Sequence, residues 1–563
     1  MSPKFIARAE ILIIVLLACV PLFIRLPYRV NIFLSWEGAY RMSQGQVPFR
    51  DFGIPLGGIF WVIPAIFFKI FGAKMITLIK AQVLLNVISG LAFRSILRSL
   101  SVNEGIRLAS VILFCLSYSF FNFWPWYNHS VIVYELVALA MLFRYFRADI
   151  VMAGGRYRFA WLVVAGFFTC CSFLTKQDGG ALAFVLSFGL LAVNGILWRK
   201  WKPLLVYTVS FVILLWLMIL PFPSHGFGYW FNHGQPPHSS RVSLFDIIDE
   251  LFGSSPWIRF YIFLIVVLAV VRWRSWVAVR ADKAGVLLTV LAMGILAEAA
   301  VMQVTSYTPP DNNIFFHSFA FACVFSMLVP FLPIRPEKPV LLLVLSLGIV
   351  VWWSGNWWNY AQRILARSLP GKEMAKVSPT GENVVNKSTY MINRDTTRDI
   401  PMSEWIECGL PAFRKIVMPA PTVAGIRRLL DRDPVKAYRQ AGGAGQAGTG
   451  GGLRVLNMSE LTPLAAEIPF ALERNPELPL WYHLGVGMFN RQADSFETRI
   501  SRHYYDLVLF EYIPTLNNFY PFRVRDSLRM HYLQVDSFPA PRRGAETQGI
   551  IEVFVPPASN AAR

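Results

Sequence analysis

The residues best suited to chemistry lie between positions 36 and 52. Trp36-Glu37-Gly38-Ala39-Tyr40 is followed, after a short gap, by Pro48-Phe49-Arg50-Asp51-Phe52. Two carboxylates, an arginine and several aromatic rings therefore follow the first apolar segment of the chain. A carboxylate within hydrogen-bond reach can take a proton from a reacting hydroxyl, and an arginine can hold a phosphate. This combination favours an enzyme over a channel.

Composition and hydropathy predict a membrane protein. Of the 563 residues, 55% are hydrophobic and 15% charged, and long apolar runs recur from Ile11 to Trp357. A helix of roughly 20 residues spans a bilayer. We predict about eleven spans, near residues 10–27, 77–95, 106–123, 130–146, 159–175, 180–197, 203–221, 257–271, 284–303, 315–333 and 339–357. The expected fold class is an α-helical polytopic membrane protein with a C-terminal extracytoplasmic α/β domain.

The net charge of +19 is explained by topology. If the N-terminus is cytoplasmic, most Lys and Arg of the first 357 residues fall in cytoplasmic loops, as the positive-inside rule requires. No nucleic-acid partner is expected, because no reader motif accompanies the charge. The pattern holds only if residues 54–71 do not span, so we predict that this segment lies in the outer interface. The expected location is the inner (plasma) membrane, with a periplasmic or extracytoplasmic C-terminal domain.

Two domains follow from this topology. Residues 1–357 form the transmembrane domain, whose outer loop 28–76 bears the candidate site, and residues 358–563 form the soluble domain. In the second we expect a helix at Thr422–Leu430, strands at Leu453–Asn457, Leu507–Glu511 and Ile550–Val555, and a flexible Gly-rich loop at 441–452. The six cysteines have no disulfide or metal-site spacing, so we interpret them as small buried side chains.

Other polar residues fall on the same predicted outer side. The chemistry that fits these residues is transfer from a lipid-phosphate donor to a hydroxyl. Candidate ligands of the donor's phosphate are Arg50, Lys176, His233 and Arg241, and candidate substrate contacts are Tyr40, Asp178, Tyr307, Glu135 and Glu298. Glu135 and Glu298 lie inside predicted spans, where ionisable side chains usually face the bundle interior or a cavity. The loop histidines are too irregularly spaced to define a metal site, so no cofactor is assigned and a divalent metal is left open.

Each candidate also has a structural interpretation that needs no function. Glu37 could pair with Arg41 four residues on, and Asp51 could cap the next segment. Lys176 could extend to the interface, and the two intramembrane acids could hydrogen-bond neighbouring helices. These interpretations do not explain why all of these residues fall on the same side of the membrane.

At these residues the chain resembles the GT-C superfamily of polytopic glycosyltransferases, which includes protein mannosyltransferases and lipid A aminoarabinose transferases. The resemblance rests on Trp36-Glu37-Gly38-Ala39-Tyr40, on Gly45-Gln46-Val47-Pro48-Phe49-Arg50-Asp51-Phe52 with Pro55-Leu56, and on Leu174-Thr175-Lys176. It covers most of residues 1–357 in layout. Where the family usually has the first acid of a pair, this chain has Trp36.

The resemblance implies an inverting transfer from a polyprenyl-phosphate-linked sugar on the extracytoplasmic face. Glu37 would be the base and Asp51 would position the acceptor or a metal, while Lys176, with Arg50 or His233, would bind the donor phosphate. The expected partners are that donor, membrane lipid and a glycan, lipid or protein acceptor. Two rival functions stay open. A transporter of lipid-linked sugars predicts internal repeats and midplane charges, and a non-catalytic envelope assembly protein is favoured by Trp36.

Overall fold

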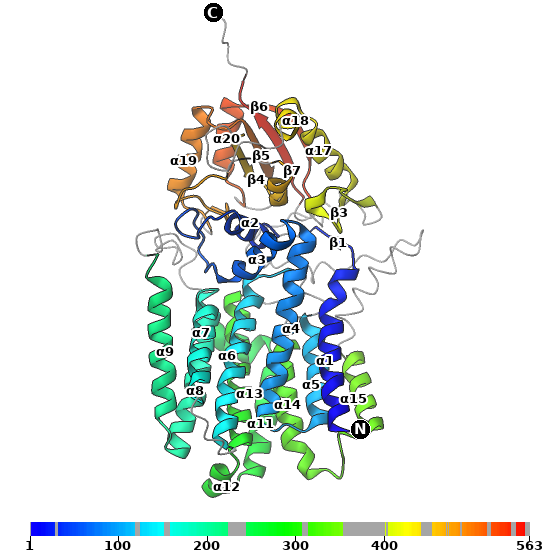
Figure 1. Ribbon diagram of the computed structural model, residues 1–563, viewed down its shortest axis with the longest axis vertical. Coiled ribbons are helices and arrows are strands. Elements are labelled where there is room, and N and C mark those ends of the chain that lie inside the picture. The colour runs from blue at the N-terminus through cyan, green and yellow to red at the C-terminus, as the bar shows by residue number, and fades with distance from the viewer. Residues whose placement is uncertain are drawn as a thin grey trace, which may run out of the picture. The chain divides into compact units, whose positions relative to one another are not determined.

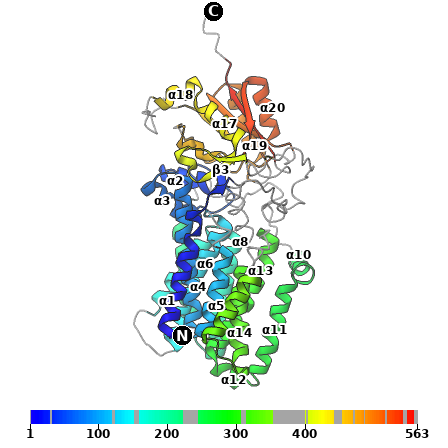
Figure 2. The same cartoon turned by 90° about the vertical axis from the view of Figure 1, so that its right-hand side faces the viewer.

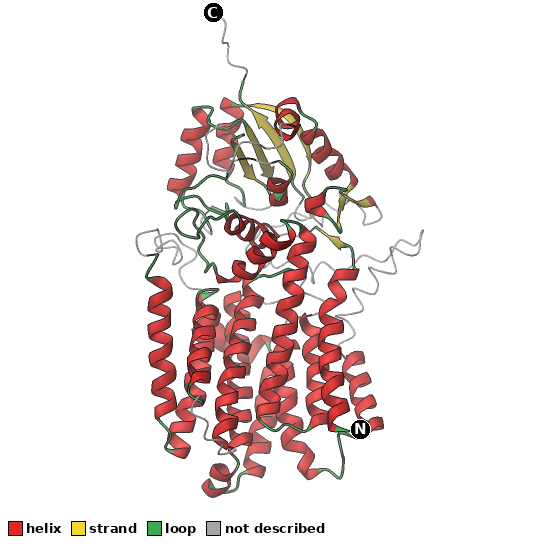
Figure 3. Ribbon diagram, in the orientation of Figure 1, coloured by secondary structure: helices red, strands yellow, loops and turns green. Residues whose placement is uncertain are grey.

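The chain is predominantly helical, with two small sheets, in a computed structural model (Figures 1 and 3). The structure describes residues 2–28, 32–118, 124–150, 158–222, 244–306, 314–352, 400, 404–440, 453–468, 470, 472–484, 487–514, 519–541 and 548–557. They divide into two compact units. The first contains residues 1–23, 82–221 and 240–377, and the second contains residues 24–81, 222–239 and 378–563.

The first unit is a helical bundle (Figures 1 and 2). Its helices are α1 Pro3–Cys19, most of α4 Met75–Ser99, α5 Glu104–Tyr118, α6 Tyr127–Ile150, α7 Ala160–Phe173, α8 Gln177–Trp198, α9 Lys202–Ile219, α10 Leu244–Asp249, α11 Pro256–Arg272, α12 Trp276–Ala281, α13 Lys283–Ser306, α14 Ile314–Leu328 and α15 Pro339–Trp352. Every predicted span overlaps one of these helices. Five helices of the described chain are long and apolar enough to cross a membrane, or six if the bent pair Leu244–Ser254 and Pro256–Arg272 is one span. The protein is therefore a multi-pass membrane protein, and the number of eleven spans stays a prediction.

Aromatic packing and a buried ion-pair triad hold this bundle together. The ring of Phe93 on α4 stacks on Phe114 of α5 at 4.6 Å and meets Phe319 of α14 edge-on at 4.8 Å. Glu10 of α1 is fully buried and accepts from Arg94 at 2.6 Å and from Arg107 at 2.7 Å. The triad thus links α1, α4 and α5 through one carboxylate.

The first helix differs from its prediction. The expected span 10–27 is replaced by α1, which begins at Pro3 and ends at Cys19. Ser2 caps the first turn by accepting from the Phe5 N–H, and Pro3 fits the first helical position. Pro21 follows the last α-helical turn, where its ring disfavours further helix, and the chain reaches strand β1 Leu26–Pro27.

The second unit combines short helices with two sheets. Its elements near the N-terminus are β1, α2 Ile32–Ser43, a 3-10 turn Ile59–Trp61 and α3 Val62–Phe71. Its later elements are β2 Trp405–Glu407, β3 Ile416–Pro419, α17 Ala420–Leu430, α18 Asp433–Gln440, β4 Val455–Met458, a 3-10 turn Thr462–Ala466, α19 Asn490–Ser501, β5 Leu507–Tyr512, α20 Phe522–His531, β6 Leu533–Pro539 and β7 Ile550–Val555. The predicted helix at 422–430 and the three predicted strands are confirmed.

The sheets explain why residues 24–81 belong to this unit. β1 pairs parallel with β3, so that Leu26 lies opposite Ile416, and β2 pairs antiparallel with β3. The larger sheet has the order β4-β5-β7-β6. Farther along the early segment, the Gly53 N–H donates to the Leu478 carbonyl at 2.7 Å, and the Leu480 N–H donates to the Gly53 carbonyl at 3.1 Å. The predicted division at residue 357 and the Gly-rich loop 441–452 lie outside the described residues.

Candidate active site

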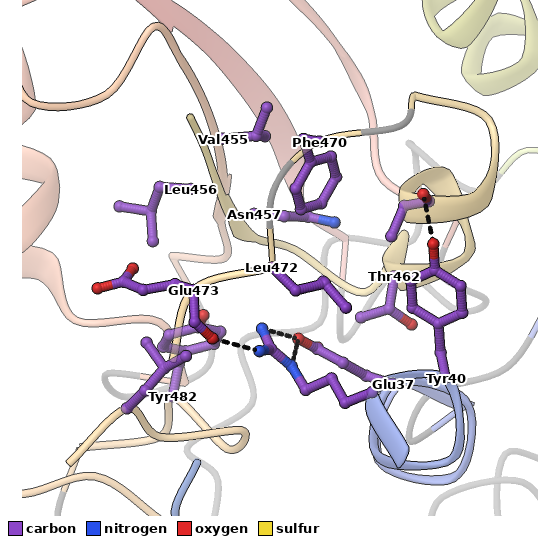
Figure 4. Close-up of a pocket in the computed structure, with 13 residues that line it drawn as sticks. Glu37, Tyr40, Val455, Leu456, Asn457, Thr462, Phe470, Leu472, Glu473 and Tyr482 are labelled. Atoms are coloured by element: carbon purple, nitrogen blue, oxygen red, sulfur yellow. Dashed lines mark hydrogen bonds and ion pairs between the residues drawn. The ribbon is translucent and has the colours of Figure 1, made fainter. Parts of the chain in front are cut away.

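Helix α2 carries the first candidate segment, and its two faces have different neighbours. Trp36 is fully buried, stacks on Tyr40 with ring centroids 4.6 Å apart, and lies 5.7 Å from the ring of Phe68 on α3. Trp36 thus fills the packing between α2 and α3. Glu37, one residue on, lines a pocket (Figure 4).

Gly38 lets helix α2 approach the turn that precedes α3. A Cβ at this position would overlap the indole ring of Trp61, which is fully buried and donates from Nε1 to the Leu34 carbonyl at 2.7 Å. The glycine of the segment is therefore required for a close contact and sets the position of its neighbour Glu37.

Glu37 forms a two-point ion pair with Arg41. Arg41 donates from Nε at 3.0 Å and from Nη2 at 2.9 Å, and both bonds go to Oε1 of Glu37. Burial raises the pKa of Glu37 above its ordinary value, and the Arg41 charge and hydrogen bonds partly oppose this rise. The pairing with Arg41 that the sequence left open is thus present. It engages one carboxylate oxygen of the two.

The pocket at Glu37 is built from segments far apart in the sequence (Figure 4). Its lining comes from α2, β4 and the stretch between residues 462 and 482, and it comprises Glu37, Tyr40, Arg41, Val455, Leu456, Asn457, Thr462, Ala465, Phe470, Leu472, Glu473, Leu478 and Tyr482. Its volume of about 30 Å³ accommodates water but not a sugar ring. All of these residues belong to the second unit.

Three further hydrogen bonds fix the pocket walls. Arg41 Nη1 donates to the Glu473 carbonyl at 3.0 Å and to Gln46 Oε1 at 3.0 Å, and the Tyr40 hydroxyl donates to the Ala465 carbonyl at 3.1 Å. Burial, aided by the nearby Glu37 charge, raises the pKa of Tyr482 well above its usual value. Tyr482 is therefore a neutral hydroxyl at neutral pH.

Asp51 and Arg50 pair with each other in the following loop. Asp51 Oδ2 accepts from the Val47 N–H at 2.7 Å and from Arg50 Nη2 at 2.7 Å. Burial works against ionisation of Asp51, but the Arg50 hydrogen bond and the Val47 N–H outweigh it, so that the pKa of Asp51 is lowered. Asp51 thus holds the turn over residues 47–51, and the Arg50 side chain remains 41% exposed.

The remaining described candidates lie in the first unit and form two pairs. Lys176, at the start of α8, donates to Asp178 Oδ2 at 2.9 Å and lies 6.0 Å from the ring of Tyr127. Glu135 on α6 and Glu298 on α13 are both buried and interact with each other. The predicted ligands His233, Arg241 and Tyr307 lie outside the described residues.

Sequence reasoning missed the pocket wall contributed by residues 455–482. Glu473 and Tyr482 approach Glu37 and Arg41 although more than four hundred residues separate them in the chain. The available signal was the run Pro479-Leu480-Trp481-Tyr482-His483, in which aromatic and polar side chains are unusually dense. Within the described residues, no group of three or more His, Cys, Asp or Glu side chains is arranged to hold a metal ion.

Known proteins resemble this chain only distantly. No family model matches it, and no curated protein matches it. Its structure is similar to that of ArnT from Cupriavidus metallidurans bound to undecaprenyl phosphate, at 14% identity over 98% of each chain and a TM-score of 0.46. For the apo state of ArnT the values are 14% identity, 97% of this chain, 98% of that chain and a TM-score of 0.48. The arabinofuranosyltransferase AftD from Mycobacteria is 13% identical over 99% of this chain and 40% of its own, with a TM-score of 0.42.

Proposed function

We propose that this protein is a membrane glycosyltransferase that moves a sugar from a polyprenyl-phosphate donor to a hydroxyl acceptor on the extracytoplasmic face. The observation that carries the proposal is the position of Glu37. It is a carboxylate whose side chain is 13% exposed and whose pKa is raised, at the wall of a pocket and on the helix that carries the GT-C-like segment. The multi-pass apolar helices supply the membrane setting that a polyprenyl donor needs.

In the proposed reaction Glu37 is the general base. The acceptor oxygen attacks the anomeric carbon as the bond from that carbon to the phosphate oxygen breaks, and the polyprenyl phosphate leaves with the bond's electron pair. The acceptor proton passes to Glu37, and the single displacement inverts the anomeric centre. Arg41 occupies Oε1, which leaves Oε2 for the acceptor hydroxyl. A sugar requires the pocket to widen from its present volume.

The roles of the other candidates remain part of the proposal. Tyr40 contributes a pocket wall, and the exposed guanidinium of Arg50 is available to a phosphate oxygen while Asp51 orients it. Lys176 is a proposed ligand of the donor phosphate, and Asp178, Glu135 and Glu298 are proposed substrate contacts.

The test is Glu37→Gln, which keeps the size of the side chain and removes the base. We expect transfer measured in membranes from a radiolabelled polyprenyl-phosphate sugar pool to fall at least about 100-fold. The matched control is Glu477→Gln, since Glu477 is an exposed carboxylate of the same unit paired with Arg491. Unchanged turnover in Glu37→Gln would remove Glu37 as the base.

A second function is favoured by the same ion pair. Glu37 is bonded to Arg41, and Trp36 occupies the position where the family has an acid, so the fold could serve envelope assembly without catalysis. The two functions differ in their products. A mass-spectrometric comparison of envelope lipids and glycans in the deletion strain, complemented with wild type or Glu37→Gln, separates them: an assembly protein is complemented by both chains.

A further inference from the structure

One end of the helical bundle holds a cluster of cations around a single carboxylate. We define the Asp149 cluster as Asp149, Arg158, Lys200, Lys202 and Lys283. It lies where α6 and α8 end and where α7, α9 and α13 begin. The charge pattern of the sequence predicts this side of the membrane to be cytoplasmic.

The contacts in the cluster are close. Asp149 is 9% exposed, and its Oδ1 accepts from Lys200 Nζ at 2.7 Å while its Oδ2 accepts from Lys283 Nζ at 2.8 Å. Arg158 lies 3.9 Å from Oδ1. Lys283 is held further by Asn194 Oδ1 at 2.5 Å. Each carboxylate oxygen thus accepts one hydrogen bond from a lysine of another segment of the bundle.

The ring of Phe159 links the fourth cation, Lys202, to the cluster. The Arg158 guanidinium and the Lys202 ammonium lie 5.0 Å and 5.1 Å from the ring centroid of Phe159. Three of the four cations, Arg158, Lys200 and Lys283, therefore pair with Asp149, and Lys202 joins them through the Phe159 ring. In the described chain, Asp149 is the one acid that forms ion pairs with members of this cluster. The cluster carries a formal surplus of three positive charges.

The surplus is accessible. The side chains of Lys200 and Arg158 are 45% and 38% exposed, whereas that of Lys283 is 12% exposed. Lys283 and Asp149 are the buried members of the cluster. Lys200, Lys202 and Arg158 form the open rim, where an anion can approach.

The apolar surroundings of the rim indicate which anion. Trp201 lies between the two rim lysines and is 52% exposed, and Ile196 on α8 and Leu205 on α9 are 62% and 65% exposed. Helix α9 lies at the edge of the bundle (Figure 1), with little of its apolar length covered by protein. A small inorganic ion gains nothing from contact with these apolar side chains, whereas an acyl chain buries apolar surface against them.

We propose that the Asp149 cluster binds the phosphate of an anionic phospholipid, whose acyl chains lie along α8 and α9. The ammonium and guanidinium groups of the rim satisfy the phosphodiester oxygens, and the exposed apolar side chains contact the tails. The site is independent of the pocket at Glu37. It would stabilise the helix ends in a membrane that contains acidic lipid.

The experiment measures lipid retention by the full-length protein, purified in detergent and delipidated. Native mass spectrometry with phosphatidylglycerol, phosphatidylcholine or inorganic phosphate gives the relative dissociation constants. We expect phosphatidylglycerol to bind at least about ten-fold more tightly than phosphatidylcholine. Each rim lysine contributes about a five-fold effect, so Lys200→Gln with Lys202→Gln should weaken phosphatidylglycerol binding by about twenty-five-fold.

Two variants control for folding and for general charge. Lys200→Arg with Lys202→Arg keeps both charges and should retain the lipid. Lys4→Gln with Arg8→Gln removes two exposed cations of α1 and should bind like wild type, with size-exclusion profiles checking that all variants are folded. Equal weakening in the α1 variant, no preference over phosphatidylcholine, or equal binding of inorganic phosphate would overturn the proposal.

Discussion

At the scale of single residues, the behaviour of Glu37 is decided by two opposing effects. Burial destabilises its carboxylate, whereas Arg41 at 2.9 Å stabilises it. Burial is the larger effect, so the pKa of Glu37 is raised. A base with a raised pKa is a stronger proton acceptor, provided that the pH stays above that pKa. Removing the arginine should change this balance without changing the carboxylate itself.

The first prediction concerns the pH dependence of transfer in Arg41→Gln. The active form of Glu37 is ionised, so activity should be lost as the pH falls through its pKa. Without the Arg41 charge that pKa rises further, and we expect the acid limb of kcat/KM to move to higher pH by about one unit or more. The measurement is the pH profile of transfer in membranes.

Arg491→Gln is the control, because Arg491 is exposed and pairs with Glu477. Its profile should coincide with that of wild type. If the acid limb of Arg41→Gln stayed where it is in wild type, Glu37 would not be the group that titrates.

At the scale of elements, α2 is positioned by a contact that only glycine permits. Gly38 faces the rigid indole of Trp61, and both ends of that indole are fixed: its Nε1 is bonded to Leu34, and its ring meets Phe52 edge-on at 5.7 Å. The ring cannot move aside for a methyl group. Any larger side chain at position 38 must therefore push α2 away.

The second prediction is that Gly38→Ala destabilises the protein. Overpacking at a rigid contact costs about 1–3 kcal/mol, although alanine favours helix by itself. We expect a lower midpoint of thermal unfolding for the full-length protein in detergent, together with reduced transfer because Glu37 moves with the helix.

Gly189→Ala provides the matched comparison. Gly189 lies in α8, and no heavy atom lies within 4 Å of the place that its Cβ would take. There the same substitution should leave the midpoint unchanged or raise it slightly, by the helix preference of alanine. Equal destabilisation of the two variants would refute the packing argument at Gly38.

At the scale of the whole molecule, local patterns predicted the elements but not their partners. Apolar runs located the helices of the bundle, and short β-rich runs located β4, β5 and β7, because both signals are contained in neighbouring residues. The expected end of the first span at residue 27 was too late, because hydropathy continues past Phe23, where the 3-10 turn Val20–Phe23 that follows α1 ends.

The pocket could not be predicted for a different reason. Its walls depend on contacts such as that of Arg41 with the Glu473 carbonyl, whose partners are separated by 432 residues. No periodicity in a single sequence encodes such a pairing. The candidate residue Glu37 was found from its type and neighbours, whereas its environment came only from the structure.

The last prediction follows from the composition of the second unit. Residues 24–81 supply β1, which pairs with β3, and α2, which supplies one wall of the pocket. A protein made of residues 378–563 alone leaves that edge of β3 unpaired and the apolar lining Val455, Leu456 and Leu478 without its cover, so it should be unfolded or aggregated.

Residues 24–73 joined by a flexible linker to 378–563 should restore a soluble, cooperatively unfolding protein. Circular dichroism and thermal melts compare the two. If the shorter protein melted as cooperatively and at the same temperature as the longer one, residues 24–73 would not belong to the core of this unit. The hydrogen bonds of Gly53 with Leu478 and Leu480, and of Tyr28 with Glu460, predict that they do.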